Sequence, residues 1–367
     1  MSATASVAPA PVAWLGGPSA FGLALPDAAP TPSTLYAPRG VCLAGGALIA
    51  ADTGNHRLLI WPDAAALADH APAEVVVGKG DMTSEGPGLL FLPTGVLVHE
   101  GRLIVADAWH HRILIWDEVP RASGTAPDVV LGQAGLDGVT EGCGPRAFYW
   151  PFGVAVVDDV FWVADTGNRR VLGWSGGVPG PGVDADLLLG QPDFEHRGEN
   201  RDGPVAADSL RWPHAVSGAA GRLAVADAGN HRVLFWRAPE RGGPAGAVLG
   251  QPDFATAVEY PYRPQGPRAM RFPYGVADRG AELFVADTSN NRVLVLDDVG
   301  ATLAGAPAGG AADRVLGQPD LDANGENRWD AVGADSLCWP YGLAVDGDLL
   351  AVADSGNNRV TLWSVPR

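Results

Sequence analysis

An Asp followed five residues later by an Arg recurs six times along this chain of 367 residues. The intervening segment is short and similar in each copy, for example Thr-Gly-Asn-His, and each copy lies between two apolar runs. The copies are Asp52–Arg57, Asp107–Arg112, Asp165–Arg170, Asp227–Arg232, Asp287–Arg292 and Asp354–Arg359. Repetition at near-regular spacing predicts one supersecondary unit used six times, so the chain must fold as an array of similar units.

Each unit divides into four short apolar segments bounded by Gly, Pro, Asn and Asp. In the third unit these segments are residues 151–157, 160–164, 170–174 and 187–191. Apolar runs of four to seven residues separated by turn-forming residues are typical of antiparallel β-strands. The 49 Gly and 31 Pro of the chain also favour many short strands joined by turns. Four such strands in every repeat predict the blade of a β-propeller.

The fourth segment of the unit carries a Val-Leu-Gly-Gln motif whose copies do not follow the order of the other segments. Five copies follow the first five Asp-to-Arg turns, and the sixth, Val12-Ala-Trp-Leu-Gly-Gly, precedes all of them. We therefore predict an all-β, six-bladed β-propeller in which the N-terminal strand completes the last blade and closes the ring. Residues 1–367 then form one domain, with residues 1–11 flexible and residues 12–17 as the closing strand.

The repeated motif resembles that of NHL-repeat propellers over about residues 12–367. The resemblance rests on the Val-Ala-Asp-x-x-Asn-His-Arg-Val core of each unit and on its Pro-x-Gly-Val lead-in. The longer Val-Leu-Gly-Gln-Pro-Asp-Phe element is similar to a bacterial branch of the family. The resemblance implies the fold but not one activity, because the family includes scaffolds, receptors and lyases.

The composition narrows the classes of partner. The formal charge of −17, with a single lysine at Lys79, disfavours nucleic acids and anionic membranes. No run of about 18 apolar residues predicts a membrane span, and the N-terminus has no secretory pattern, so we expect a cytoplasmic protein. The three cysteines are widely spaced and indicate thiols in a reducing compartment.

The repeated turn residues have a structural interpretation. The Asp and Arg of each turn are expected at matching ends of two antiparallel strands, where a charge pair would pin the hairpin. The Asn at the third loop position is expected to adopt the left-handed conformation of a tight turn. A catalytic Asp would not be expected in six equivalent copies.

Binding residues are better sought where the repeats differ. The residue between Pro and Gly at the start of each first strand should ring the central opening, and its identity varies: Arg39, Thr94, Phe152, His214, Tyr274 and Tyr341. These side chains either bind a small anion or peptide segment or plug the channel mouth. The face on which they open is also predicted to receive all the long connections, such as residues 194–211 and 321–338. Both connections contain Gly-Glu-Asn-Arg, at 198–201 and 325–328, and Ala-Asp-Ser-Leu, at 207–210 and 334–337. These shared motifs indicate either ordered packing or a ligand role.

The second unit departs from the others in its turn, where Trp109, His110 and His111 replace the usual Gly-Asn pair and the residue after it. Trp109 is a candidate contact residue for a partner, with local packing as the alternative. His110 is also a candidate, although adjacent side chains in a turn point apart and so are poor joint ligands for a metal.

Three functions remain open. The first hypothesis is a non-catalytic protein- or ligand-binding scaffold, with a protein or peptide partner and no cofactor or metal. The second is a lyase or hydrolase at the channel mouth, for which only His214 and Asp278 offer metal ligands, too few for a three-ligand site. The third is an accessory protein for the assembly of a larger redox enzyme.

Overall fold

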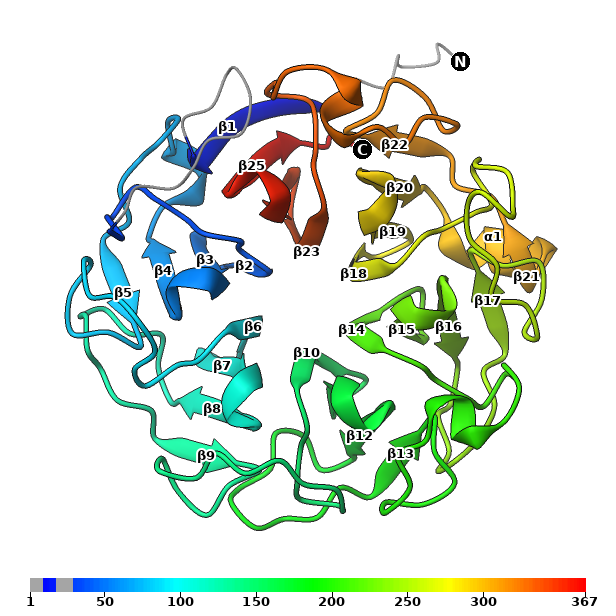
Figure 1. The fold of residues 1–367 in the computed structure, drawn as a ribbon, viewed down its shortest axis with the longest axis horizontal. Helices are drawn as coiled ribbons and strands as arrows, with labels where there is room; N and C mark the ends of the chain where they lie inside the picture. The colour runs from blue at the N-terminus through cyan, green and yellow to red at the C-terminus, as the bar shows by residue number, and fades with distance from the viewer. Residues whose placement is uncertain (1–8, 18–28) are drawn as a thin grey trace.

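A computed structural model describes residues 9–17 and 29–367 of the chain. Six sheets stand around a central axis, each with the strand of its Pro-x-Gly segment innermost (Figure 1). The prediction of an all-β, six-bladed propeller is therefore confirmed. The described residues contain one α-helix, α1 (Val299–Gly305), and the other helical segments are short 3₁₀ turns.

The strands occupy equivalent positions in the six blades. The innermost strands are β2 (Gly40–Ala44), β6 (Pro93–His99), β10 (Pro151–Val157), β14 (Pro213–Gly218), β18 (Pro273–Arg279) and β23 (Pro340–Asp346). The second strands are β3 (Ala47–Asp52), β7 (Arg102–Asp107), β11 (Val160–Asp165), β15 (Leu223–Asp227), β19 (Glu282–Asp287) and β24 (Leu349–Asp354). The third strands are β4 (Arg57–Trp61), β8 (Arg112–Trp116), β12 (Arg170–Trp174), β16 (Arg232–Trp236), β20 (Arg292–Leu296) and β25 (Arg359–Ser364). The outer strands are β5 (Val75–Val77), β9 (Val129–Leu131), β13 (Leu187–Leu189), β17 (Ala247–Leu249), β22 (Arg314–Leu316) and β1 (Ala10–Gly16).

The sixth sheet combines the two ends of the described chain. Its strand order is β1-β25-β24-β23, and β1 pairs antiparallel with β25, with Gly16 opposite Arg359 (Figure 1). The strand begins earlier than expected, since Ala10 and Pro11 belong to it rather than to a flexible segment. Residues 1–8, the rest of the predicted flexible segment apart from Pro9, lie outside the described residues.

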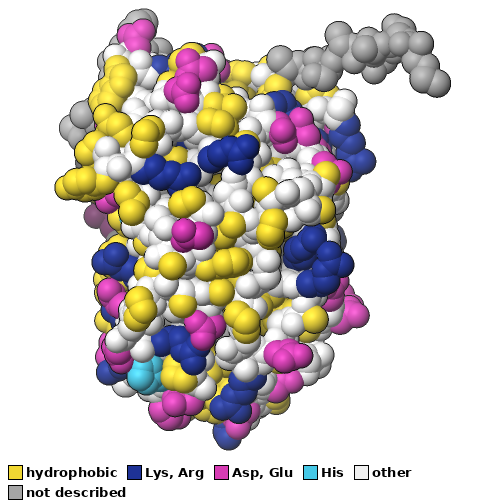
Figure 2. Space-filling model, turned by 90° about the vertical axis from the view of Figure 1, so that its right-hand side faces the viewer, with side chains coloured by type: hydrophobic (Ala, Val, Ile, Leu, Met, Phe, Trp, Pro, Cys, Tyr) yellow, Lys and Arg dark blue, Asp and Glu magenta, His cyan; other side chains and the backbone are white. Residues whose placement is uncertain are grey.

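The core is formed where neighbouring sheets pack against each other. Each of six hydrophobic clusters combines side chains from two adjacent blades, as where Ile113 of blade two packs in one cluster with Phe161 and Leu172 of blade three. These side chains are fully buried, and each contributes about 1.5–3 kcal/mol relative to an exposed position. The outer side of the ring, shown in Figure 2, carries acidic and basic side chains interspersed with small apolar ones. None of the described helices is long and apolar enough to span a membrane.

The Asp and Arg of each turn form the predicted ion pair in all six blades. In the first blade Asp52 lies directly opposite Arg57, and Arg57 Nε is 2.7 Å from Asp52 Oδ2. The other Asp52 oxygen accepts the backbone N–H of Tyr36, at 2.6 Å, and each equivalent Asp accepts from the residue 16 positions earlier. The pair therefore joins the hairpin to the segment that leads into the innermost strand.

Each turn is a 3₁₀ helix: η1 (Thr53–Asn55), η3 (Ala108–His110), η4 (Thr166–Asn168), η6 (Ala228–Asn230), η7 (Thr288–Asn290) and η9 (Ser355–Asn357). The prediction that the Asn of the turn is left-handed is wrong. The left-handed residue is the next one, such as His56 with φ 57°, while Asn55 donates its side-chain N–H to Asp52. The Asp52 carboxylate thus holds Asn55 in the 3₁₀ turn. The next residue, His56, takes the left-handed conformation that turns the chain into the third strand.

The buried arginines also order the long connections from one blade to the next. Arg232 donates through Nη2 to the carbonyls of Ala206 and Ser209, and through Nη1 to that of Phe254. Arg170 and Arg292 make the corresponding contacts in their blades. A planar guanidinium with five donors can satisfy a carboxylate and several carbonyls together.

The motifs shared by residues 194–211 and 321–338 bind to one another within each connection. In the second of these, Asn327 Oδ1 accepts from Ser336 Oγ at 2.9 Å, and Arg328 pairs with Asp335 at 2.8 Å. The short helices η5 (Glu199–Asp202) and η8 (Glu326–Trp329) lie in these connections. Their polar motifs are therefore used for internal packing.

We call the face that carries the 3₁₀ turns and the connections between blades the loop face. The prediction that it receives all the long connections is wrong. Residues 297–313, between β20 and β22, leave the opposite ends of the strands and contain α1 and β21 (Ala308–Gly310). β21 pairs parallel with β17 and adds a fifth strand to the fourth sheet. The other short helix, η2 (Ala64–Ala66), also lies between a third and an outer strand.

Candidate functional site

The six residues between Pro and Gly of the innermost strands lie together at one end of the central channel. We call Arg39, Thr94, Phe152, His214, Tyr274 and Tyr341 the mouth ring. All six line the channel, which has a volume of about 240 Å³. Five of them stack in sequence around the opening. The centroid distances are 4.6 Å for Phe152–His214, 4.2 Å for His214–Tyr274 and 4.7 Å for Tyr274–Tyr341, with the Arg39 guanidinium 4.9 Å from the Tyr341 ring.

The glycine after the mouth-ring residue explains how the innermost strands approach so closely. A Cβ placed on Gly40 would lie 1.7 Å from the carbonyl oxygen of Thr94 in the next blade, and one on Gly153 would lie 2.6 Å from that of His214. A side chain at either position would therefore separate adjacent blades. The glycine of the Pro-x-Gly motif is required because it lies against the backbone carbonyl of the mouth-ring residue in the next blade.

Thr94 differs from the other members of the mouth ring. Its side chain is buried, and its hydroxyl lies within hydrogen-bond distance of the carbonyls of Pro151 and Phe152, at 3.3 and 3.2 Å. The hydroxyl fastens blade two to blade three instead of facing the opening. We therefore leave Thr94 out of the proposed binding surface.

The charge at the mouth comes from Arg39. Its guanidinium forms no hydrogen bond or ion pair within the described residues, and its Nε is buried. Burial lowers the pKa of His214 to about 4, against the opposing effect of the Trp212 carbonyl that accepts from Nδ1. Burial also raises the pKa of Tyr274 to about 12 and raises that of Tyr341. At neutral pH the mouth therefore presents one cation, one neutral imidazole and two neutral phenols.

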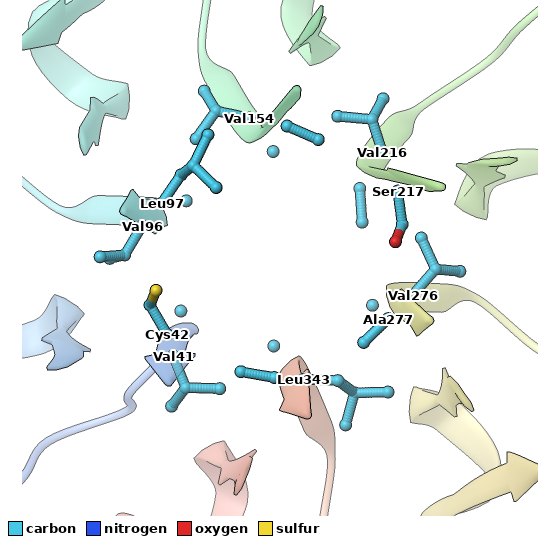
Figure 3. A pocket seen from close by; sticks show the side chains of 18 of the residues that line it. Val41, Cys42, Val96, Leu97, Val154, Val216, Ser217, Val276, Ala277 and Leu343 are labelled. Carbon is cyan, nitrogen blue, oxygen red and sulfur yellow. The ribbon is translucent and has the colours of Figure 1, made fainter. Parts of the chain in front are cut away.

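Below the mouth the channel is apolar. Its lining includes Val96, Val154 and Leu343, and the sulfur of Cys42 and the oxygen of Ser217 are the heteroatoms among the labelled side chains of Figure 3. Ser217 Oγ lies 2.8 Å from Asp278 Oδ1, and burial raises the pKa of that carboxyl.

The two candidate metal ligands do not meet. His214 is the second residue of β14 and Asp278 the sixth of β18. Because the innermost strands all start at the loop face, the two side chains are separated by roughly 13 Å along the channel, at about 3.3 Å per residue. Within residues 9–17 and 29–367, no group of three His, Cys, Asp or Glu side chains is placed to hold a metal.

A second hollow, which we call the aromatic pocket, adjoins the mouth ring. It has a volume of about 280 Å³ and is lined by Arg39, Trp109, Tyr149, Trp150, Phe152, Thr166, Gly167, Arg169, Trp212, His214 and Tyr274. Four of these residues also line the channel, so the two spaces share a wall. Trp150 and Trp212 were not predicted from the sequence as binding residues. The position directly before the repeated Pro varies between blades as the mouth ring does, and this variation was the available indication.

Trp109 and His110 point in different directions. Trp109 is 37% exposed and stacks on Trp150, with ring centroids 4.9 Å apart. His110 takes the place of the turn Asn, and its Nδ1 lies 2.9 Å from Asp107 Oδ2 and 3.1 Å from Arg112 Nη2. Trp109 therefore stays in the proposed binding surface, whereas His110 belongs to the hairpin and is left out.

Large exposed aromatic side chains gather on the loop face. Six Tyr and Trp residues are more than a third exposed among the described residues: Tyr36 47%, Trp109 37%, Tyr260 45%, Tyr262 85%, Trp329 78% and Trp339 50%. Every one lies in a 3₁₀ turn or in a segment that leads from one blade to the next. The opposite face has none of the six.

Residues 337–361 match the family model of the NHL repeat. The chain contains an NHL repeat. The match covers the start of β23 through the third residue of β25, which includes the turn of the sixth blade. No curated protein matches this chain significantly.

Several solved structures are similar to this chain. A protein of unknown function from Bacteroides thetaiotaomicron has a TM-score of 0.51 at 12% identity, with 97% of this chain and 75% of that chain covered. A nidogen/laminin complex gives 0.47 at 14% identity, covering 85% and 86%. A catalytically inactive virginiamycin B lyase from Staphylococcus aureus with quinupristin gives 0.46 at 9% identity, covering 89% and 94%. At 12% identity the likeness to the Bacteroides thetaiotaomicron protein shows the fold alone.

Proposed function

We propose that the protein is a non-catalytic scaffold that binds a protein partner through its loop face. The observation that carries this proposal is the restriction of all six exposed Tyr and Trp side chains to that face. Aromatic side chains are enriched at protein interfaces because they bury a large area and lose little conformational entropy. Such a collection of rings on one face indicates an interaction surface.

The scaffold beneath these rings is suited to presenting them. Buried Arg–Asp pairs tie each connection to its blade, and polar motifs such as Asn327 with Ser336 hold the loops internally. The loops therefore present a preorganised surface, so binding does not have to order them. Partner binding would bury the rings of Tyr262 and Trp329, which lie in different inter-blade connections.

The test is affinity capture from lysate of the source organism by the wild-type protein and by a Tyr262→Ser/Trp329→Ser double variant. Both rings are largely exposed, so the variant should fold normally, which circular dichroism checks. We expect capture of a defined partner to fall at least about tenfold, the usual effect of losing an aromatic hot spot.

Val183→Ser is the matched control, since Val183 is 52% exposed in the connection between β12 and β13, on the opposite face. It should capture the partner as the wild type does. Equal capture by all three proteins, or loss of capture in the control alone, would contradict the proposal.

A further inference from the structure

Arg39 is a cation without a counterion in a concave site. The other arginines near it have acidic partners: Arg169 and Arg211 both face Glu199, at 3.7 and 3.3 Å, and Arg271 lies 2.6 Å from Glu259. Among the described residues no carboxylate lines the aromatic pocket, and the one that lines the channel, Asp278, lies toward its other end. In a chain of formal charge −17, this leaves a local positive site that suits an anion.

The groups beside Arg39 suit a carboxylate in particular. A guanidinium binds a planar carboxylate through two parallel N–H donors, and the buried Nε of Arg39 has no acceptor in the described structure. The hydroxyls of Tyr274 and Tyr341 likewise make no hydrogen bond within the described residues and remain neutral donors. His214 is also neutral at pH 7, so Arg39 supplies the one positive charge of the mouth. A ligand with one negative charge therefore suits the site better than a ligand with two.

The walls next to this charge suit a flat, apolar group. Trp109 and Trp150 stack with an interplanar angle of 23°, and Phe152 and Trp212 line the same pocket. Aromatic walls favour planar ligands through offset stacking. A volume of about 280 Å³ lies at the small end of ligand-binding pockets.

We infer that the mouth ring and the aromatic pocket together bind a small monocarboxylate with a planar apolar body, of the arylacetate class. The carboxylate lies against Arg39 with the phenol hydroxyls of Tyr274 and Tyr341 as further donors, and the ring lies among Trp109, Trp150 and Phe152. This site contains neither Tyr262 nor Trp329 and shares only Trp109 with the six exposed rings of the protein-partner proposal, so the two proposals are tested with different variants.

Calorimetric titration with phenylacetate and with its neutral isostere phenylacetamide tests the inference. Phenylacetate should bind at least about tenfold more tightly than the amide, because a charge-assisted hydrogen bond is worth that or more. Arg39→Gln should remove the preference for the acid with little change in the melting temperature, since the Arg39 side chain forms no hydrogen bond or ion pair with described residues and loses only its contact with the Tyr341 ring. Trp150→Ala should lower the affinity for phenylacetate and the affinity for phenylacetamide by the same factor.

Arg237→Gln, an exposed arginine just after β16 on the other face, is the control and should leave both affinities unchanged. Equal affinities of acid and amide for the wild type, or no phenylacetate binding up to about 10 mM, a Kd that corresponds to less than about 3 kcal/mol, would overturn the inference. An acetylated peptide that ends in Phe with a free carboxylate is the last arm. If it binds more than about tenfold tighter than phenylacetate, the site takes a peptide terminus and the small-molecule assignment is wrong.

Discussion

Arg292 Nε donates to Asp287 Oδ2 across 2.8 Å, and neither side chain has any exposed surface. Removing the carboxylate leaves a fully buried guanidinium without its counterion. We therefore expect Asp287→Ala to lower the free energy of unfolding by about 3–5 kcal/mol, the usual cost of breaking a buried pair from one side. Urea denaturation followed by tryptophan fluorescence measures it.

The control for this pair is Asp117→Ala. Asp117 lies 3.2 Å from Arg102, but its side chain is 66% exposed, and exposed pairs contribute less than about 1 kcal/mol. If the two variants lose the same stability, burial does not determine the importance of the turn pair.

Arg232→Lys should loosen one connection of the loop face. A lysine retains the charge beside Asp227 but cannot also reach the carbonyls of Ala206, Ser209 and Phe254. We expect amide hydrogen exchange over residues 196–210 to accelerate while β16 stays protected. Arg237→Lys, at an exposed position, should change nothing. Unaltered exchange in Arg232→Lys would show that the connection is held by its own contacts.

Gly40→Ala should disturb the junction between blades one and two. The added methyl would lie 1.7 Å from the Thr94 carbonyl oxygen, and because that atom belongs to the backbone, a strand must shift. We expect a loss of at least about 1–3 kcal/mol, as for other overpacked sites. Gly80→Ala meets no atom within 4 Å and is the control. A Gly40→Ala protein as stable as this control would mean that the innermost strands can separate at no cost.

His214 should make stability depend on pH. Its pKa in the folded protein is about 4, below the ordinary 6.5, so the unfolded chain binds more protons between these values. The stabilisation is therefore complete above about pH 6.5 and is lost as the pH falls toward about 4.

The measurement is the difference in urea midpoint between wild type and His214→Phe over this range. The Phe ring keeps the stacking against Phe152 and Tyr274 but cannot titrate, so it isolates His214 from His56, His111 and His231, whose pKa values burial also lowers. Parallel pH profiles would mean that His214 titrates normally at the channel mouth.

The fold was predictable from the sequence because the strands, the Asp-to-Arg turns and the Pro-x-Gly segments recur in the same order in every blade. The strands of blade three begin where the apolar runs predicted, at Pro151, Val160, Arg170 and Leu187. The Asp–Arg pairs followed from their positions at matching strand ends. The mouth ring was locatable for the same reason, since Pro and Gly fix its position in every blade.

The features that were not predicted depend on contacts between units. The reach of Arg170 to the carbonyls of Gly144 and Ala147 crosses the junction of two blades, so no local pattern encodes it. The aromatic pocket combines residues of five blades, and Trp109, Trp150 and Trp212 belong to three of them. The helix α1 and β21 interrupt the repeat in one blade, where periodicity gives no guidance.

The pairing of β1 with β25 has a consequence for the order of folding. β1 is synthesised before the other described strands, yet its hydrogen-bonded neighbour in the sheet, β25, is the last of them in the chain. The sheets of blades one to five can form from local hairpins during synthesis. The pairing of β1 with β25 instead costs the loop-closure entropy of the whole chain between them. Until it forms, β25 has an unpaired edge that a strand from another molecule could occupy. Assembly of the sixth sheet is therefore the step at which this protein is most exposed to exchange of strands between copies.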